Sequence, residues 1–265
     1  MIKSRIIIGT SGWGSKISFN KSYEIGSKLI EFGINNFDTA PNYGSGYSHH
    51  ILNQLSKNYK MSVDTKFGDI TIPSFKELAK RIYRFHDYKS FKRSLGYLQL
   101  SRNIRKNFYF WRIENLKKNL DFFFEDLKDC NINILYLHSP PLGIINKQYL
   151  IELDKFLKSK KIKLGISWPN EKDIDLLIDQ FSHIQLQISF EFYLKHQNKL
   201  IKNFRSLYIN SILKNKNLTT NNKENYSLIN DILKDFQYEN NYKFVIGINS
   251  MNSFEKLTNY SFNVY

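Results

Sequence analysis

The chain has 265 residues, of which 42% are hydrophobic and 15% aromatic. That length is ordinary for one α/β barrel, and no linker rich in Gly, Ser or Pro divides it, so we expect a single domain over residues 1–265. The single cysteine, Cys130, excludes an internal disulfide. Apolar runs reach neither the roughly 18 residues of a membrane span nor the ~7–15 of a signal peptide. We therefore expect a cytoplasmic protein with no membrane partner.

The formal net charge of +15 is compatible with a nucleic-acid partner or with an anionic substrate. However, the chain is also crowded with Asn, Ile, Phe and Tyr, which AT-rich codons specify together with Lys. Genomic composition therefore accounts for much of the excess of lysine. Because no known nucleic-acid-binding motif accompanies the charge, nucleic-acid binding is the less favoured interpretation.

Eight short apolar runs are typical of parallel strands that are buried on both faces. We expect these strands at residues 5–9, 35–38, 61–66, 132–138, 161–167, 183–188, 206–211 and 243–247. Helical patterns lie between them at residues 23–32, 113–127, 173–181 and 227–236, and Gly33 is a natural stop for the first. This alternation predicts a (β/α)8 TIM barrel. An open doubly wound sheet is the alternative, although no GxGxxG follows the first strand.

The connection over residues 67–112 contains no obvious barrel strand and exceeds the ordinary length of about 2–6 residues. It is rich in Lys, Arg and aromatic residues, and we expect one or two helices and a flap. Clustered arginines could attract a phosphorylated or nucleotide-linked sugar. The segment could instead dock a partner, or it could be an amphipathic, solvated helix pair. The sequence leaves these three alternatives open.

Titratable side chains end three successive predicted strands, at Asp38, Lys66 and His138, and Tyr43 follows the first of them. The carboxyl ends of barrel strands converge on one mouth, so these four side chains should meet there. Each residue taken alone has an ordinary structural explanation, such as a turn cap, a solvated strand end or a core histidine. Their joint placement favours a catalytic site.

These four residue types suit proton transfer to an oxygen atom. A phenol has a pKa of about 10 and is a poor acid at neutral pH. A nearby ammonium group stabilises the phenolate and lowers that pKa, and a carboxylate beside the ammonium holds it charged and in place. An imidazole can orient a carbonyl oxygen or take part in the proton relay. The set suits protonation of an oxygen that gains negative charge as hydride arrives at its carbon.

Three segments, Phe37-Asp-Thr-Ala-Pro-Asn-Tyr-Gly44, Asp64-Thr-Lys-Phe-Gly68 and Leu135-Tyr-Leu-His-Ser-Pro140, resemble the aldo-keto reductase signatures in their order and spacing. The resemblance is to short, bacterial-type members with a shortened C-terminus, and it extends over nearly the whole chain. It implies NAD(P)H-dependent reduction of an aldehyde or ketone, or the reverse oxidation, without a metal. It also implies that Tyr43 donates the proton, that Lys66 and Asp38 tune it, and that His138 orients the substrate carbonyl.

The same resemblance implies residues for the cofactor. Ser167 and Gln187 would contact the nicotinamide carboxamide, and Ser211 would contact the pyrophosphate. Residues 246–257, which include Gly247 and Ser250, resemble the loop that holds the phosphates and adenine.

Three departures weaken the cofactor site. Trp168 replaces the family's usual Asn, and Asn210 stands where the family often has an aromatic ring or Arg. The basic residue that commonly grips a 2′-phosphate is missing from the loop at residues 246–257, which leaves the choice between NADPH and NADH open. A catalytically weak barrel that binds a nucleotide or a partner protein is therefore the alternative function.

Two tryptophans, Trp13 and Trp168, are candidates to line the substrate pocket, although Trp13 could equally cover the barrel end. Short family members resemble reductases of sugar and surface-polysaccharide pathways, so the substrate could be a sugar or a nucleotide-linked sugar. We expect a monomer or a weak homo-oligomer. His49 and His50, with Asp38 and His138, could suggest a metallohydrolase, but neighbouring helical residues point in different directions, so we expect no metal.

Overall fold

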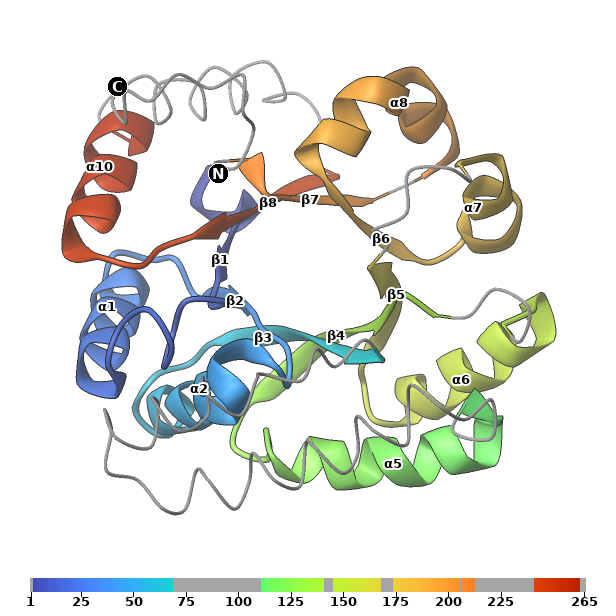
Figure 1. The fold of residues 1–265 in the computed structure, drawn as a ribbon, viewed down its shortest axis with the longest axis horizontal. Coiled ribbons are helices and arrows are strands. Elements are labelled where there is room, and N and C mark those ends of the chain that lie inside the picture. Colours follow the sequence, from blue (N-terminus) through green and yellow to red (C-terminus); the bar gives the residue numbers. More distant parts are fainter. Residues whose placement is uncertain are drawn as a thin grey trace.

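The computed structural model describes residues 2–68, 111–140, 145–167, 174–204, 206–212 and 241–262. Its eight parallel strands form a closed barrel in the order of the sequence. The strands are β1 (Ile6–Gly9), β2 (Asn36–Asp38), β3 (Ser62–Gly68), β4 (Asn131–His138), β5 (Lys163–Ser167), β6 (Gln185–Ser189), β7 (Leu207–Asn210) and β8 (Tyr242–Gly247). The closed ring, seen in Figure 1, confirms the predicted TIM barrel and excludes the open sheet.

Helices surround the ring of strands (Figure 1). The described α-helices are α1 (Phe19–Glu31), α2 (Tyr47–Asn58), α5 (Ile113–Glu125), α6 (Lys147–Ser159), α7 (Ile174–Phe181), α8 (Phe190–Asn203) and α10 (Met251–Phe262). Two 3-10 helices, η1 (Ile2–Arg5) and η2 (Tyr43–Gly46), precede β1 and α2. All eight strands are confirmed to within two residues at each end, and so is the existence of three of the predicted helices. The fourth predicted helix, at residues 227–236, and most of the long connection, residues 69–110, lie outside the described residues.

Short polar side chains fix where several helices begin. Ser18 accepts a hydrogen bond from the backbone N–H of Lys21 at the start of α1, and Ser189 accepts one from Phe192 at the start of α8. Asn146 does the same for Tyr149 in α6. Each bond satisfies a backbone donor that has no partner within the helix, which stabilises the boundary.

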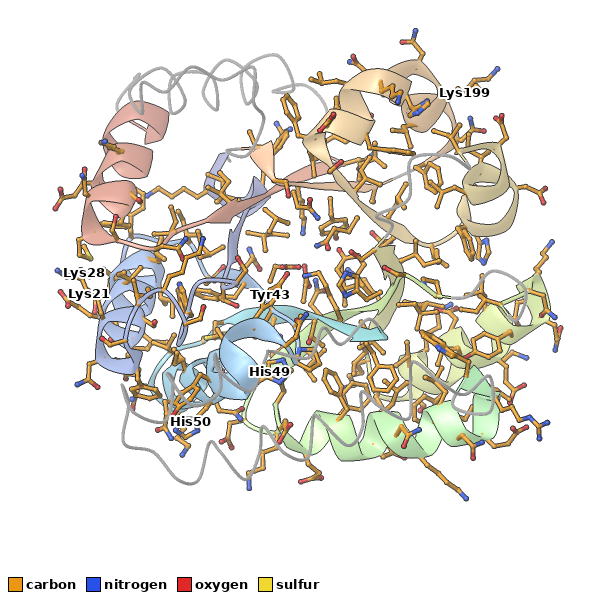
Figure 2. All side chains as sticks on the ribbon, viewed as in Figure 1. Lys21, Lys28, Tyr43, His49, His50 and Lys199 are labelled. Carbon is orange, nitrogen blue, oxygen red and sulfur yellow. The ribbon has the colours of Figure 1, made fainter. Side chains whose placement is uncertain are left out.

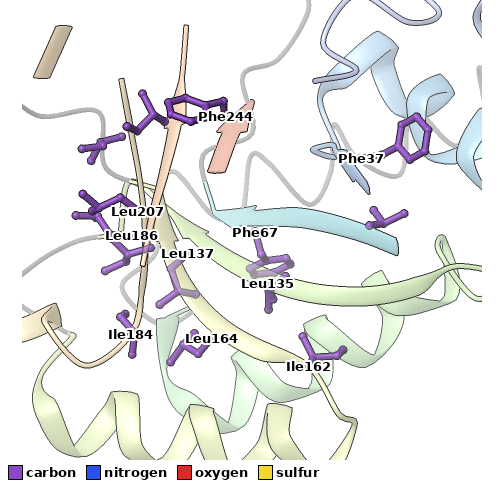
Figure 3. Packing of buried hydrophobic residues seen from close by; sticks show 14 of the residues in the cluster. Phe37, Phe67, Leu135, Leu137, Ile162, Leu164, Ile184, Leu186, Leu207 and Phe244 are labelled. Carbon is purple, nitrogen blue, oxygen red and sulfur yellow. The ribbon is translucent and has the colours of Figure 1, made fainter. Parts of the chain in front are cut away.

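Side chains that point outward from the strands pack against the helices. Figure 3 shows Phe67, Leu135, Leu137 and Leu164 on the side of the strands that faces α5 and α6, and all four are buried. Successive residues of a strand point to opposite faces. This outer layer therefore leaves the intervening residues of each strand for the inside of the barrel.

A smaller apolar cluster fills the middle of the barrel and consists of Ile7, Ile134, Tyr136, Tyr208 and Val245. The rings of Tyr136 and Tyr208 meet edge to face with centroids 5.7 Å apart. Gly165 makes room for Tyr136, because a Cβ atom at this position would lie 2.5 Å from Cδ1 of the ring. The barrel interior is thus packed, as expected for an eight-stranded barrel.

In the part of the chain that the structure describes, no helix has the length and apolar character needed to cross a membrane.

Candidate active site

The strand register brings the predicted catalytic residues to one end of the barrel. Asp38 is the last residue of β2, Lys66 lies two residues before the end of the adjacent strand β3, and His138 ends β4 opposite Gly68. Ser167 ends β5 and pairs in register with His138 on one side and Gln187 on the other. The structure therefore assembles these residues at the carboxyl-terminal mouth, as the sequence predicted.

Asp38 and Lys66 form a buried ion pair. The Nζ atom of Lys66 lies 2.5 Å from each carboxylate oxygen of Asp38 and also donates to the backbone carbonyl of Thr39 at 3.3 Å. Each side chain retains at most 4% of its exposed surface. A charge-assisted contact to both oxygens fixes the ammonium group in orientation as well as in place.

Tyr43 lies beside this ion pair at the start of η2. Its ring centroid is 5.1 Å from Nζ of Lys66, and Figure 2 shows it near the centre of the ring of strands. The backbone conformation that places Tyr43 here requires glycine at position 44. Gly44 has φ +58, and a Cβ atom there would lie 2.2 Å from the backbone oxygen of Trp13. Any larger residue would push the loop, and with it Tyr43, away from Lys66.

Burial and the neighbouring Lys66 change the pKa of the Tyr43 phenol in opposite directions. Burial raises the pKa of Tyr43, the attraction and hydrogen bond of Lys66 lower it, and repulsion by Asp38 raises it. The net direction is upward, so the expected lowering by Lys66 is present but burial outweighs it. For Lys66 burial lowers the pKa, but Asp38 and Tyr43 raise it, and the net direction is again upward. Tyr43 is therefore a neutral phenol beside a fully charged ammonium group.

A hydrogen-bonded chain crosses the barrel mouth from the predicted cofactor side to the ion pair. The hydroxyl of Ser167 donates to Oε1 of Gln187 at 3.0 Å, and Nε2 of Gln187 donates to Oδ1 of Asp38 at 2.7 Å. The Ser167 oxygen can still accept a bond, and Gln187 has a second amide hydrogen. These groups offer the donor and acceptor that a carboxamide needs.

The predicted phosphate side lies where β7 and β8 end. Ser211 follows β7 in the left-handed backbone region, with φ 60, and Gly247 is the last residue of β8. Ser250 accepts a hydrogen bond at 3.0 Å from the backbone N–H of Ser253 in the first turn of α10. The first turn of a 12-residue helix and adjacent hydroxyls form a donor set that suits a pyrophosphate. The described residues at this end thus include groups of the kinds that bind a carboxamide and phosphates.

Trp13 does not line the mouth, contrary to one of its two predicted roles. Its side chain is 0% exposed, packs on Phe37 with ring centroids 5.8 Å apart, and donates from Nε1 to the carbonyl of Ile248 at 3.0 Å. Gly26 in α1 leaves space for Leu55 and the indole, since a Cβ atom there would lie 2.5 Å from Cδ1 of Leu55 and 3.1 Å from Cη2 of Trp13. Trp13 therefore belongs to the outer layer, between β2 and α1, and not to either end of the barrel. Trp168 lies outside the described residues.

The two neighbouring histidines of α2 take no part in the mouth. His49 is buried against Phe123 with ring centroids 5.6 Å apart, and His50 lies against Phe19 at 5.3 Å. Figure 2 shows both on the helix outside the ring of strands. Among the described residues, no three His, Cys, Asp or Glu side chains are grouped closely enough to hold a metal ion.

One polar residue of the barrel interior had no role assigned from the sequence. Asp64 is 4% exposed and accepts a hydrogen bond at 2.8 Å from Nδ2 of Asn133. The alternation of β3 puts it on the same face as Lys66, which is a signal that the sequence does carry.

Comparisons with known proteins agree with this architecture. The aldo/keto reductase family model matches residues 5–251, whereas no curated protein matches the chain. Among solved structures, aldo-keto reductase AKR11C1 from Bacillus halodurans (holo form) is 13% identical, with a TM-score of 0.68 over 98% of this chain and 87% of that one. Glycerol dehydrogenase AKR11B4 from Gluconobacter oxydans is 16% identical, with a TM-score of 0.61 over 97% and 86%. At these identities the structures support the fold, and because the family model spans most of its length, the chain belongs to the aldo/keto reductase family.

Proposed function

We propose that this protein is an NAD(P)H-dependent oxidoreductase that reduces an aldehyde or ketone to an alcohol, or catalyses the reverse oxidation. The observation that carries the proposal is the buried Asp38–Lys66 ion pair with the Tyr43 ring 5.1 Å from the ammonium group. Proton donation by a positioned side chain is a common source of catalysis, and an adjacent positive charge stabilises the phenolate that remains.

Reduction needs a proton on the carbonyl oxygen as hydride reaches the carbonyl carbon. The hydride would come from a bound nicotinamide cofactor. Tyr43 donates its phenolic proton to the oxygen, Lys66 stabilises the tyrosinate, and Asp38 keeps Lys66 charged and in place. His138, at the end of β4, orients the carbonyl oxygen. In the oxidation direction the tyrosinate accepts the proton from the alcohol.

The cofactor is held by two groups of residues in this proposal. Ser167 and Gln187 bind the carboxamide, and their hydrogen bonds to each other and to Asp38 prepare them for it. Ser211, Gly247 and Ser250 bind the phosphates at the ends of β7 and β8 and at the start of α10. The sequence of this loop favours neither NADPH nor NADH, so both belong in the test.

The proposed substrate is a small carbonyl compound of the sugar type, free or nucleotide-linked. The formal net charge of +15 favours an anionic form, because a positive protein raises the local concentration of anions. We propose that the protein acts as a monomer or a weak homo-oligomer.

The direct test follows the oxidation of NADPH and of NADH with a panel of aldehydes, ketones and keto-sugars, each with and without a phosphate or nucleotide group. We expect turnover with at least one substrate and its loss in Tyr43→Phe. Full turnover by Tyr43→Phe would refute the mechanism. A fluorescence titration with both cofactors completes the test. Binding without turnover over the whole panel would favour a nucleotide-binding barrel, whereas no binding of either cofactor would refute the enzyme and the nucleotide-binding protein alike.

A further inference from the structure

Asp64 lies inside the barrel, one layer below the ion pair. It is two residues before Lys66 on the inward face of β3, and it pairs in register with Asp38 of β2 and Ile134 of β4. The register between β3 and β4 shifts at this point, so Asn133 is an extra residue of β4 and its amide reaches the Asp64 carboxylate at 2.8 Å. A bulge of this kind commonly re-aims a side chain.

Charged and titratable groups of five strands interact electrostatically with Asp64. Asp38 comes from β2, Lys66 from β3, Tyr136 from β4, Tyr208 from β7 and Lys243 from β8. The Tyr136 hydroxyl is buried, and no described residue hydrogen-bonds to it. Lys243 is half-buried at the opposite end of the barrel, with Nζ 5.6 Å from the centroid of the Tyr208 ring. Asp64 therefore interacts electrostatically both with Asp38 and Lys66 at the carboxyl-terminal mouth and with Lys243 at the opposite end of the barrel.

Opposing influences on the Asp64 carboxyl place its pKa close to neutrality, so the neutral and the charged form are both populated there. Burial raises the pKa of Asp64, the hydrogen bond from Asn133 lowers it, Asp38 raises it, and Lys243 and Lys66 lower it, which leaves the pKa at about 7. A buried carboxyl whose pKa lies near neutrality changes its charge within the range in which enzymes work.

Building on the proposed function, we propose that Asp64 is a positioning residue whose charge, acting on Lys66 from inside the barrel, controls how readily Tyr43 gives up its proton. When Asp64 is neutral, the positive charge of Lys66 is available to Asp38 and to the forming tyrosinate. When Asp64 is ionised, its negative charge offsets part of the positive potential that Lys66 exerts on Tyr43. The tyrosinate is then less stable, and reduction is slower.

The sign of the pH effect follows from this arrangement. Asp64 loses its proton as the pH rises through neutrality, so the rate of reduction falls there. In the oxidation direction the tyrosinate is the base. An ionised Asp64 raises the proton affinity of the tyrosinate, so in that direction proton uptake becomes more favourable as the pH rises. Because the tyrosinate carries only part of its charge in the transition state and the interior is partly screened, we expect the rate to change by roughly threefold to tenfold.

The first experiment measures the pH profile of single-turnover reduction in the wild type and in Asp64→Asn. The variant is nearly isosteric and keeps an oxygen that can accept the bond from Asn133. We expect the wild-type rate to fall by roughly threefold to tenfold across neutrality and the fall to be absent in Asp64→Asn. An identical fall in the variant would overturn the proposal.

Lys243→Met is the matched second variant, because Lys243 stabilises the ionised form of Asp64 from outside the catalytic mouth. We expect the rate on the acid side to be unchanged and the fall in rate to move to higher pH. A residue with a merely structural role would not produce this displacement. If the fall stays at the same pH in Lys243→Met, the coupling is refuted.

A readout independent of turnover separates this proposal from the proposed function. The carboxyl signal of Asp64 in carbon-13-labelled protein is identified by its absence in Asp64→Asn, and its titration is followed by NMR. We expect a midpoint near neutrality that rises in Lys243→Met. A midpoint in the ordinary range of aspartate overturns the inference even if the enzyme is active. A midpoint near neutrality in a protein that reduces no carbonyl compound refutes the proposed function and, with it, the role of Asp64 as a positioning residue.

Discussion

The side-chain amide of Gln187 donates to Oδ1 of Asp38 at 2.7 Å, across the mouth of the barrel. Gln187 belongs to β6 and Asp38 to β2, which are separated by three strands on either side of the closed ring. The predicted cofactor side and the predicted proton-transfer side are therefore joined through a buried hydrogen bond. A change at one side should be felt at the other.

Replacement of Gln187 tests this connection. Gln187→Met fills a similar volume but removes the donor to the Asp38 carboxylate, and hydrogen bonds to charged groups contribute about 1.5–3 kcal/mol to stability. We expect a loss of that size in urea denaturation together with weaker cofactor binding. Ser167→Ala is the control, because it leaves the Gln187–Asp38 bond in place. A larger loss of stability in Ser167→Ala than in Gln187→Met would contradict the expectation.

The fold was predictable because burial on both faces leaves a simple signal in the sequence. Residues 5–9 and 243–247 are nearly continuous apolar runs, and the structure pairs β1 with β8 to close the ring. Asp38, Lys66 and His138 were predictable for a related reason, since Asp38 and His138 end their strands and Lys66 lies two residues before the end of β3. A charge at the end of a buried strand can reach only the mouth.

What the sequence could not reveal depends on contacts between distant elements. The burial of Trp13 depends on the Phe37 ring on one side and the carbonyl of Ile248 on the other. The tie between Gln187 and Asp38 requires the ring to be closed. The surroundings of Asp64 combine a bulge at Asn133 with a lysine from the last strand. Neither periodicity nor spacing carries that information.

Tyr43→Phe should separate proton transfer from binding. The ring can keep its place beside Lys66 while the phenolic proton is lost, and general acid catalysis is typically worth ~10²–10⁴-fold. We expect stopped-flow reduction to slow by about that factor, with cofactor affinity and thermal midpoint near the wild-type values. A comparable slowing with much weaker cofactor binding would instead indicate that Tyr43 helps to hold the cofactor.

Loss of Lys66 should cost more stability than loss of the whole ion pair. Lys66→Met leaves the buried Asp38 carboxylate without its ammonium partner, and breaking a buried pair in this way costs about 3–5 kcal/mol. The double variant Lys66→Met with Asp38→Asn removes both charges and should recover much of that loss. The measurement is urea denaturation of the two single variants and the double variant. Additive losses would mean that the two side chains are not coupled.

Asp64 should make the protein less stable as the pH rises from about 4 to 7. In the unfolded chain this carboxyl titrates near 3.8, whereas burial raises its pKa in the folded protein to about 7. Between these values the folded state binds more protons than the unfolded state, so stability falls as the pH rises, and it levels off above the folded pKa. The full effect of this group is as much as about 4 kcal/mol. Asp64→Asn cannot ionise, so its stability relative to the wild type should increase by about 2–3 kcal/mol between pH 5 and pH 8.

The control for that measurement is Asp175→Asn on α7. Asp175 lies at the surface with a side chain that is 80% exposed, in an ion pair with Lys199. Exposed pairs contribute at most about 1 kcal/mol, so the stability difference between this variant and the wild type should change little between the two pH values. Urea denaturation curves at four or more pH values give both differences. The stability of Asp64→Asn relative to the wild type could instead change as little with pH as that of Asp175→Asn. In that case the buried carboxyl is already ionised at low pH, and its neighbours do not raise its pKa as inferred.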